Sequence, residues 1–275
     1  MPTGRFFLGR SGREGRRMPQ PRTRGHWVWL VVIGLAAGFL SGLFGVGGGI
    51  LIVPALLLLL ALDQRIAAGT SLAAIVPMAA VGMLSYALSG SVDWIAGLLL
   101  VAGSVVGAQI GIRLLNRIPR RVVSWLFIGF LLVVIATLFL VTPSRDAFVE
   151  ITLLSGAGLV LLGLGTGVLS GLLGIGGGVV IVPLLILLFG ASDLVAKGTS
   201  LAVIIPTALF GTIGNFRRGN VDLPAAAVIG VAACTTTAAG AAVAAVISPA
   251  LSSVLFAVFL VAVAVQMTVK LLRSN

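Results

Sequence analysis

Apolar residues run along this chain in long, solid blocks, and polar residues stand mostly between the blocks. Solid blocks predict helices, because the strands of a membrane barrel would alternate apolar and polar positions. Eight blocks approach the length of about 20 residues that crosses a bilayer as a helix. They cover about 27–44, 66–88, 94–115, 121–141, 149–173, 196–215, 223–247 and 250–272. The pattern therefore predicts an all-α fold, a polytopic helical membrane protein.

Two shorter blocks, at about 50–62 and 179–190, each follow a glycine-rich stretch. A helix of about 13 residues rises only about 20 Å, which is less than the roughly 30 Å of a hydrocarbon core. We therefore expect half-helices or strongly mismatched spans at these two places, each after a glycine-broken helix.

The glycine-rich stretches belong to an internal repeat. Ser41–Pro54 (SGLFGVGGGILIVP) returns 129 residues later as Ser170–Pro183 (SGLLGIGGGVVIVP), with 10 of 14 positions identical. Further motifs keep the same spacing: Gly-Thr-Ser-Leu at 69–72 and 198–201, and Gly-x-Val-Asp at 90–93 and 219–222. A unit of this length exceeds the periods of solenoid repeats and indicates a duplicated half-protein. The expected parts are a tail at 1–26, a first transmembrane repeat at 27–141 and a second at 149–273.

Composition agrees with a membrane protein and accounts for the net charge. Of 275 residues, 59% are hydrophobic and 9% are charged, whereas soluble domains carry about 25% charged residues. The net charge of +11 does not indicate nucleic-acid binding, because seven of the 18 basic residues lie in the first 24 positions. We expect this tail to be disordered and cytoplasmic, next to anionic headgroups. Its Arg-rich composition also fits a transit peptide, and a start at Met18 would leave most of it out.

Positive charge orients the helices. Basic residues gather in four places: the tail, Arg113 to Arg121, Arg217–Arg218 and Lys270–Arg273. If each glycine-rich element is a bend, all four lie on the cytoplasmic side, as the positive-inside rule requires. If 27–62 were one continuous span, the cluster starting at Arg113 would lie outside. The first arrangement gives each half an odd number of segments, which predicts two inverted repeats and two cytoplasmic termini.

The glycine triplets are the main candidate binding site. Each triplet precedes a short helix, whose first N–H groups are unpaired and carry a partial positive charge. In a low-dielectric interior such helix starts are natural anion sites. The candidate ligands are the backbone N–H groups of Gly47, Gly48, Gly49, Gly176, Gly177 and Gly178. Helix packing alone is the alternative, and it is expected for Gly34, Gly38 and Gly42 and for their repeat mates.

Hydroxyl and proline residues stand near the triplets. Thr70, Ser71, Thr199 and Ser200 lie where we expect helices to start, so they can cap free N–H groups or donate to a bound oxyanion. Pro77 and Pro206 are expected to kink these helices, as candidates for gating.

Charged residues are rare inside the apolar blocks. Asp93 and Asp222 are predicted helix N-caps, or else gating or proton-coupling sites. Lys197 takes the place of Ala68 in the repeat and is either a substrate-attracting charge or an interfacial lysine. With one His and one Cys, the chain lacks the groups for most hydrolytic or metal chemistry. We therefore expect no enzyme activity, no metal and no cofactor.

These motifs resemble those of the sulfite exporter TauE/SafE family. The resemblance rests on Gly-x-Gly-Gly-Gly-x-x-x-Val-Pro at 45–54 and 174–183, on the doubled Gly-Thr-Ser-Leu and Gly-x-Val-Asp motifs, and on Gly103-x-x-x-Gly-Ala-x-x-Gly111. It covers about 34–273, although the second copy departs from Gly-Ala-x-x-Gly. The resemblance implies a plasma-membrane permease for small sulfur-containing anions such as sulfite or an organosulfonate.

The sequence thus predicts a secondary transporter that moves a small anion by alternating access in the cell membrane. A passive anion channel and a non-transporting membrane scaffold or sensor are the alternatives. The expected partners are a small anionic substrate and the lipid bilayer, without nucleic acid. Proton coupling and the oligomeric state stay open.

Overall fold

The computed structural model describes residues 24–114 and 148–273, together with scattered positions between 122 and 136. Most of the predicted tail 1–26 and of the predicted segment 121–141 therefore lies outside the described residues.

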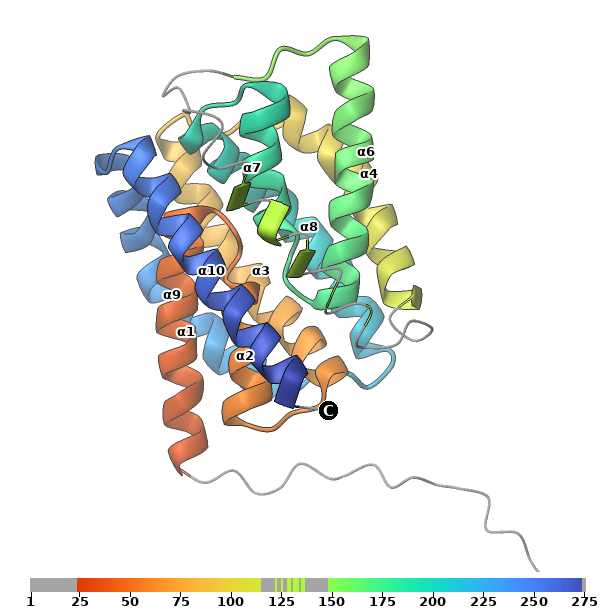
Figure 1. The fold of residues 1–275 in the computed structure, drawn as a ribbon, viewed down its shortest axis with the longest axis vertical. Coiled ribbons are helices and arrows are strands. Elements are labelled where there is room, and N and C mark those ends of the chain that lie inside the picture. The colour runs from red at the N-terminus through yellow and green to blue at the C-terminus, as the bar shows by residue number, and fades with distance from the viewer. Residues whose placement is uncertain are drawn as a thin grey trace, which may run out of the picture.

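The described chain is helical along almost all its length (Figure 1). Its helices are α1 (Arg24–Phe44), α2 (Gly49–Leu59), α3 (Gln64–Leu88), α4 (Trp94–Leu114), α6 (Leu153–Leu173), α7 (Gly178–Phe189), α8 (Asp193–Phe216), α9 (Leu223–Val246) and α10 (Pro249–Arg273). Among the described residues, seven helices are long and apolar enough to cross a membrane, and α2 and α7 are the shorter ones. The prediction of a polytopic helical membrane protein is confirmed.

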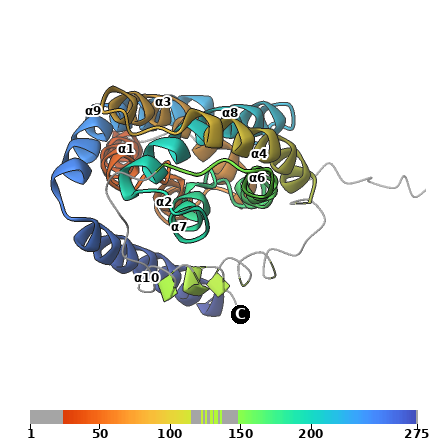
Figure 2. The same ribbon diagram turned by 90° about the horizontal axis from the view of Figure 1, so that it is seen from above.

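The helices pack in layers (Figure 2). Helices α9, α3, α8 and α4 lie along one side of the molecule, and α1, α2, α7 and α6 lie against them. Helix α10 covers the opposite side, where Phe256 packs on Phe44 with ring centroids 5.0 Å apart. The two short helices therefore lie in the middle of the molecule, between longer helices.

The first helix of each half packs against the fourth helix of the other half: α1 lies on α9, and α6 lies on α4. Small residues make these contacts possible. A side chain at Gly38 would collide with the carbonyl oxygen of Ala233, and one at Gly167 with the carbonyl oxygen of Ser104. The packing role expected for these glycines is confirmed, and each half covers a surface that the other would leave exposed.

Helices α3 and α8 are equivalent in the repeat, and they run antiparallel along each other. Gly69, near the start of α3, packs on the carbonyl oxygen of Asn220, just after the end of α8. Gly198, near the start of α8, packs on the carbonyl oxygen of Ser91, just after the end of α3. Such reciprocal contacts are typical of two copies related by an approximate two-fold axis.

Hydrogen bonds bring the charged loops together at two ends. The Arg218 guanidinium donates to the carbonyl oxygen of Ile112 at 2.9 Å, so the basic ends of α4 and α8 lie together. The Val149 amide donates to the Asp93 carboxylate at 3.2 Å, which joins the loop before α6 to the loop before α4. These contacts agree with the grouping of basic and acidic loops expected from the positive-inside rule.

Candidate functional site

The two glycine-rich stretches break the chain in the same way. The break between α1 and α2 uses positive φ angles of 70° at Gly45, 74° at Gly47 and 66° at Gly48. The break between α6 and α7 repeats them with 72°, 86° and 82° at the equivalent glycines. L-residues with side chains rarely adopt this left-handed conformation. The repeated glycines are therefore required by the backbone, beyond any role in packing.

Helices α2 and α7 begin directly after these breaks. Their N-cap residues are Gly48 and Gly177, so neither helix start has a side-chain cap. The first turns contain N–H groups that an α-helix cannot pair internally. Both starts are buried, which makes them sites where a negatively charged group would be stabilised.

The two helix starts meet each other. A Cβ atom at Gly49 would lie 2.8 Å from Cα of Ile175, in the break before α7. A Cβ atom at Gly178 would lie 2.7 Å from Cα of Val46, in the break before α2. From this meeting point α7 extends toward the top of Figure 1 and α2 toward the bottom. The structure thus brings the two predicted glycine triplets together.

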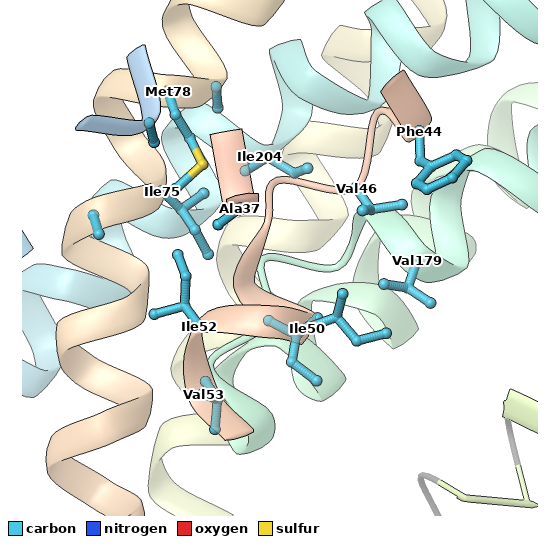
Figure 3. Close-up of a cluster of buried hydrophobic side chains, with 14 of the residues drawn as sticks. Ala37, Phe44, Val46, Ile50, Ile52, Val53, Ile75, Met78, Val179 and Ile204 are labelled. Carbon is cyan, nitrogen blue, oxygen red and sulfur yellow. The ribbon is translucent and has the colours of Figure 1, made fainter. Parts of the chain in front are cut away.

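Apolar side chains surround the breaks. A Cβ atom at Gly47 would lie 3.1 Å from Cδ1 of Ile204 and 3.4 Å from Cγ2 of Ile75. Figure 3 shows both isoleucines beside the break that leads from Phe44 to Ile50. In this conformation the glycines are in van der Waals contact with α3 and α8.

Thr70, Ser71, Thr199 and Ser200 do not lie at helix starts, so this part of the prediction is wrong. Helix α3 begins at Gln64 and α8 at Asp193, and the capping side chains belong to Asp63 and Ser192. These residues lie in the second turn of their helices. Their hydroxyl groups therefore cannot cap the N–H groups of the first turn of α3 or α8.

The hydroxyl groups of Thr70 and Thr199 form hydrogen bonds with the opposite half of the protein. Thr199 Oγ1 accepts a hydrogen bond from the Asp93 amide at 2.8 Å, and Thr70 Oγ1 accepts one from the Asp222 amide at 3.0 Å. The Gly-Thr-Ser motif of each half therefore binds the Gly-x-Val-Asp motif of the other half. This contact gives both motifs a structural role.

Replacing Thr199 with valine is expected to lower the stability of the protein by about 1–3 kcal/mol, because the buried Asp93 amide would lose its acceptor. Thr70→Val is expected to cost less, since its bond to Asp222 is only partly buried. Thermal unfolding in detergent measures both effects, with Thr199→Ser as the control that restores the acceptor. An equal loss in the serine variant would contradict the role of the hydroxyl.

Both aspartates of the Gly-x-Val-Asp motifs cap helices, as predicted. Asp93 accepts from the Ala96 amide at 3.0 Å at the start of α4, and Asp222 accepts from the Ala225 amide at 3.2 Å at the start of α9. Pro77 and Pro206 lie inside α3 and α8. A role of these four residues in gating or coupling stays a prediction.

Lys197 is buried and paired. Its Nζ atom lies 2.7 Å from the Asp193 carboxylate on the same helix and 2.7 Å from the Ser252 hydroxyl on α10. Lys197 is only 2% exposed, so its side chain is buried in the protein and does not extend along the surface toward the headgroups. A Cβ atom added at Gly45 would lie 2.6 Å from the Cα atom of Lys197. The lysine therefore stands next to the first break with its charge balanced by Asp193.

Within the part of the chain that the structure describes, four buried serine hydroxyls have no hydrogen-bond partner: Ser41, Ser71, Ser170 and Ser200. They form two pairs at the repeat spacing of 129 residues. Ser71 and Ser200 were predicted as candidate ligands from the sequence, whereas Ser41 and Ser170 were not. A sequence signal for them was present, because Ser41 and Ser170 are the first residues of the repeated glycine-rich motif.

Among the described residues, no group of His, Cys, Asp or Glu is arranged to hold a metal ion.

Comparison with known proteins identifies the family. The model of the family described as Sulfite exporter TauE/SafE matches residues 3–138 and 159–275. The chain belongs to this family. The resemblance seen in the motifs is thereby confirmed over nearly the whole length of this TauE/SafE protein.

Several relatives of this TauE/SafE protein have names of membrane transporters. The probable membrane transporter protein YunE of Bacillus subtilis (strain 168) is 32% identical over 219 residues, which cover 71% of this chain and 80% of that protein. A probable membrane transporter protein of Haemophilus influenzae is 30% identical over 269 residues, which cover 87% of this chain and 97% of that protein. No solved structure matches the chain significantly. The TauE/SafE protein is a multi-pass membrane transporter.

Proposed function

We propose that this protein is a secondary transporter that carries a small sulfur-containing anion, such as sulfite or an organosulfonate, across the plasma membrane. The observation that carries the proposal is the meeting of two uncapped, buried helix starts, those of α2 at Gly49 and of α7 at Gly178. Each start is equivalent to about half a positive charge, so the two repel each other in a low-dielectric interior. A bound anion between or beside them removes this repulsion.

Transport by alternating access is supported by the reciprocal packing of the halves. Helices α3 and α8 are equivalent and run antiparallel, so both can span one membrane only if the two halves are inverted. Inverted halves can exchange conformations, which opens one central site to either side in turn. The side chains of Ile75 and Ile204 lie against the glycine breaks. In the alternating-access proposal, this is a conformation in which these two side chains cover the binding site.

The direct ligands in this proposal are the backbone N–H groups of Gly47–Gly49 and Gly176–Gly178, with hydroxyl groups from α3 and α8. The Thr70 and Thr199 hydroxyls bind the other half, but each can still donate its own proton. Lys197 is bound by Asp193 and Ser252 in this conformation, so contact with the substrate requires that it leave them.

Uptake of labelled sulfite into proteoliposomes tests the proposal. We expect saturable uptake, acceleration by unlabelled sulfite inside the vesicles, and accumulation above the outside concentration under an imposed proton gradient if transport is coupled to protons. Counterflow requires a binding site that alternates between the two sides. A passive channel would only equilibrate the anion without counterflow, and a scaffold or sensor would give no flux at all.

A further inference from the structure

Along the described part of the chain, the four unpartnered serines differ from most other buried hydroxyls. The Thr212 hydroxyl also lacks a partner, but Met83 stands at the equivalent position of the first half, so only the serines are duplicated. Thr207 and Thr237 are equally buried and donate to carbonyl oxygens one turn earlier at 2.8 Å each, as hydroxyls in helices commonly do. Ser41, Ser71 and their repeat mates are at most 1% exposed and make no such bond. A buried hydroxyl that lacks a partner costs about 1–3 kcal/mol. The same cost in both halves indicates that these hydroxyls bind something other than the protein.

Two of the serines lie directly before the glycine breaks. Ser41 and Ser170 are in the last turns of α1 and α6, and their carbonyl oxygens accept from the first glycine of each break at 2.8 Å. The Cβ atom of Ser170 lies 3.7 Å from the place of a Cβ atom at Gly177, the N-cap of α7. This serine therefore stands beside an uncapped helix start.

The other two serines face the breaks from α3 and α8. Ser71 lies between Ala68, whose Cα is 2.5 Å from a Cβ atom at Gly174, and Ile75, which contacts Gly47 and Gly176. Residues three and four apart share one face of a helix, so Ser71 faces the same break. Ser200 repeats this arrangement between the equivalent residues of α8, which contact the break before α2.

The charge of these groups defines the charge of a suitable ligand. Hydroxyl and backbone N–H donors are neutral, and the nearby Lys197 is balanced by Asp193. Two helix starts together supply about one positive charge. The penalty for burying an ion rises with the square of its charge, so this site favours a monoanion over a dianion.

We propose that Ser41, Ser71, Ser170 and Ser200 donate hydrogen bonds to the oxygen atoms of a singly charged oxyanion held at the starts of α2 and α7. Four donors from two opposite halves suit a headgroup with several equivalent oxygen atoms, such as a sulfonate. This inference rests on the proposed function and adds the ligand hydroxyls and the charge of the substrate.

Two matched anions test the charge. Binding of methanesulfonate, a monoanion, and sulfate, a dianion, is measured by calorimetry on the purified full-length protein, with uptake in proteoliposomes alongside. We expect methanesulfonate to bind roughly 10- to 100-fold more tightly than sulfate. Equal or tighter binding of sulfate would overturn the assignment of a monoanion.

Serine-to-alanine variants test the ligand hydroxyls. Ser71→Ala and Ser200→Ala should each weaken methanesulfonate binding roughly 10- to 100-fold, the usual effect of losing a hydrogen bond to a charged group. The thermal stability of the ligand-free protein should stay equal or rise, because no bond within the protein is lost. Ser104→Ala is the control: its hydroxyl lies 2.7 Å from that of Thr207, so this change should lower stability and leave affinity unchanged.

The outcomes separate the two proposals. If anion uptake continues and the Ser71 and Ser200 variants bind methanesulfonate normally, the serine assignment is wrong and the transporter proposal stands. If the unaltered protein neither binds nor moves sulfite, methanesulfonate or sulfate, the proposed function fails and the serine assignment fails with it.

Discussion

Gly177→Ala is expected to reduce sulfite uptake roughly 10- to 100-fold, whereas Gly190→Ala leaves it nearly unchanged. Both glycines flank α7 and have positive φ angles, 82° at the start and 68° at the end. A methyl group at Gly177 would lie 3.3 Å from the carbonyl oxygen of Thr166 and 3.7 Å from Cβ of Ser170. Thr166 must shift by a few tenths of an ångström to admit this methyl group, which then covers the start of the helix, where the anion is proposed to bind.

Gly190→Ala is a matched control for backbone strain. Nothing lies within 4 Å of the place of its Cβ atom, and alanine at either position costs about 1–2 kcal/mol through the left-handed conformation. Both variants should therefore lose stability in thermal unfolding, Gly177→Ala somewhat more because of its close contact with Thr166, while uptake separates them. Similar uptake by the two variants would show that the start of α7 does not bind the substrate. Gly48→Val is a less informative test, since its Cβ atom would lie 2.8 Å from the carbonyl oxygen of Ala37.

Lys197→Met is expected to destabilise the protein by about 3–5 kcal/mol, because it leaves the Asp193 carboxylate charged and unpaired in the interior. Asp193 is 5% exposed, and its partner lies at 2.7 Å. The expected result is a large fall in the thermal midpoint in detergent and a low yield of folded protein.

The double variant Asp193→Asn with Lys197→Met separates the charge from the packing. It removes both charges, so most of the lost stability should return, as is common when a buried ion pair is replaced as a whole. The double variant also tests whether Lys197 attracts the substrate. Normal uptake in a folded double variant would exclude this role, and loss of uptake at normal stability would support it.

Helix positions were predicted well because transfer from water to lipid depends on local sequence. The block at 94–115 corresponds to α4 at Trp94–Leu114, and the short block at 50–62 to α2 at Gly49–Leu59. The breaks were equally clear, since three glycines in a row are rare in a helix and permit positive φ. The predictions agree with the structure because the free energy of transfer to lipid and the backbone conformation of glycine both depend on residues close together in the chain.

The start of α3 shows where local reading fails. The predicted apolar block began at about residue 66, so Thr70 was expected close to the helix start. Asp63 instead caps the helix by accepting from the Arg65 amide at 2.9 Å, and the helix begins at Gln64. Because Asp63 is the N-cap, the polar residues Gln64 and Arg65 belong to the helix although they precede its apolar block. Thr70 therefore lies in the second turn of α3.

The amino-acid sequence alone identifies this protein as a duplicated, helical membrane transporter of the TauE/SafE family with two glycine-broken helices. These properties follow from hydrophobicity, from repeated motifs and from the backbone freedom of glycine. The packing of the folded chain is needed to see which polar groups already form hydrogen bonds or ion pairs. The Thr199 hydroxyl accepts from the Asp93 amide, Lys197 donates to Ser252 of α10, and the Ser41 hydroxyl has no partner among the residues described. The bonds of Thr199 and Lys197 join residues far apart in the chain, so they depend on how the helices pack and cannot be predicted from neighbouring residues.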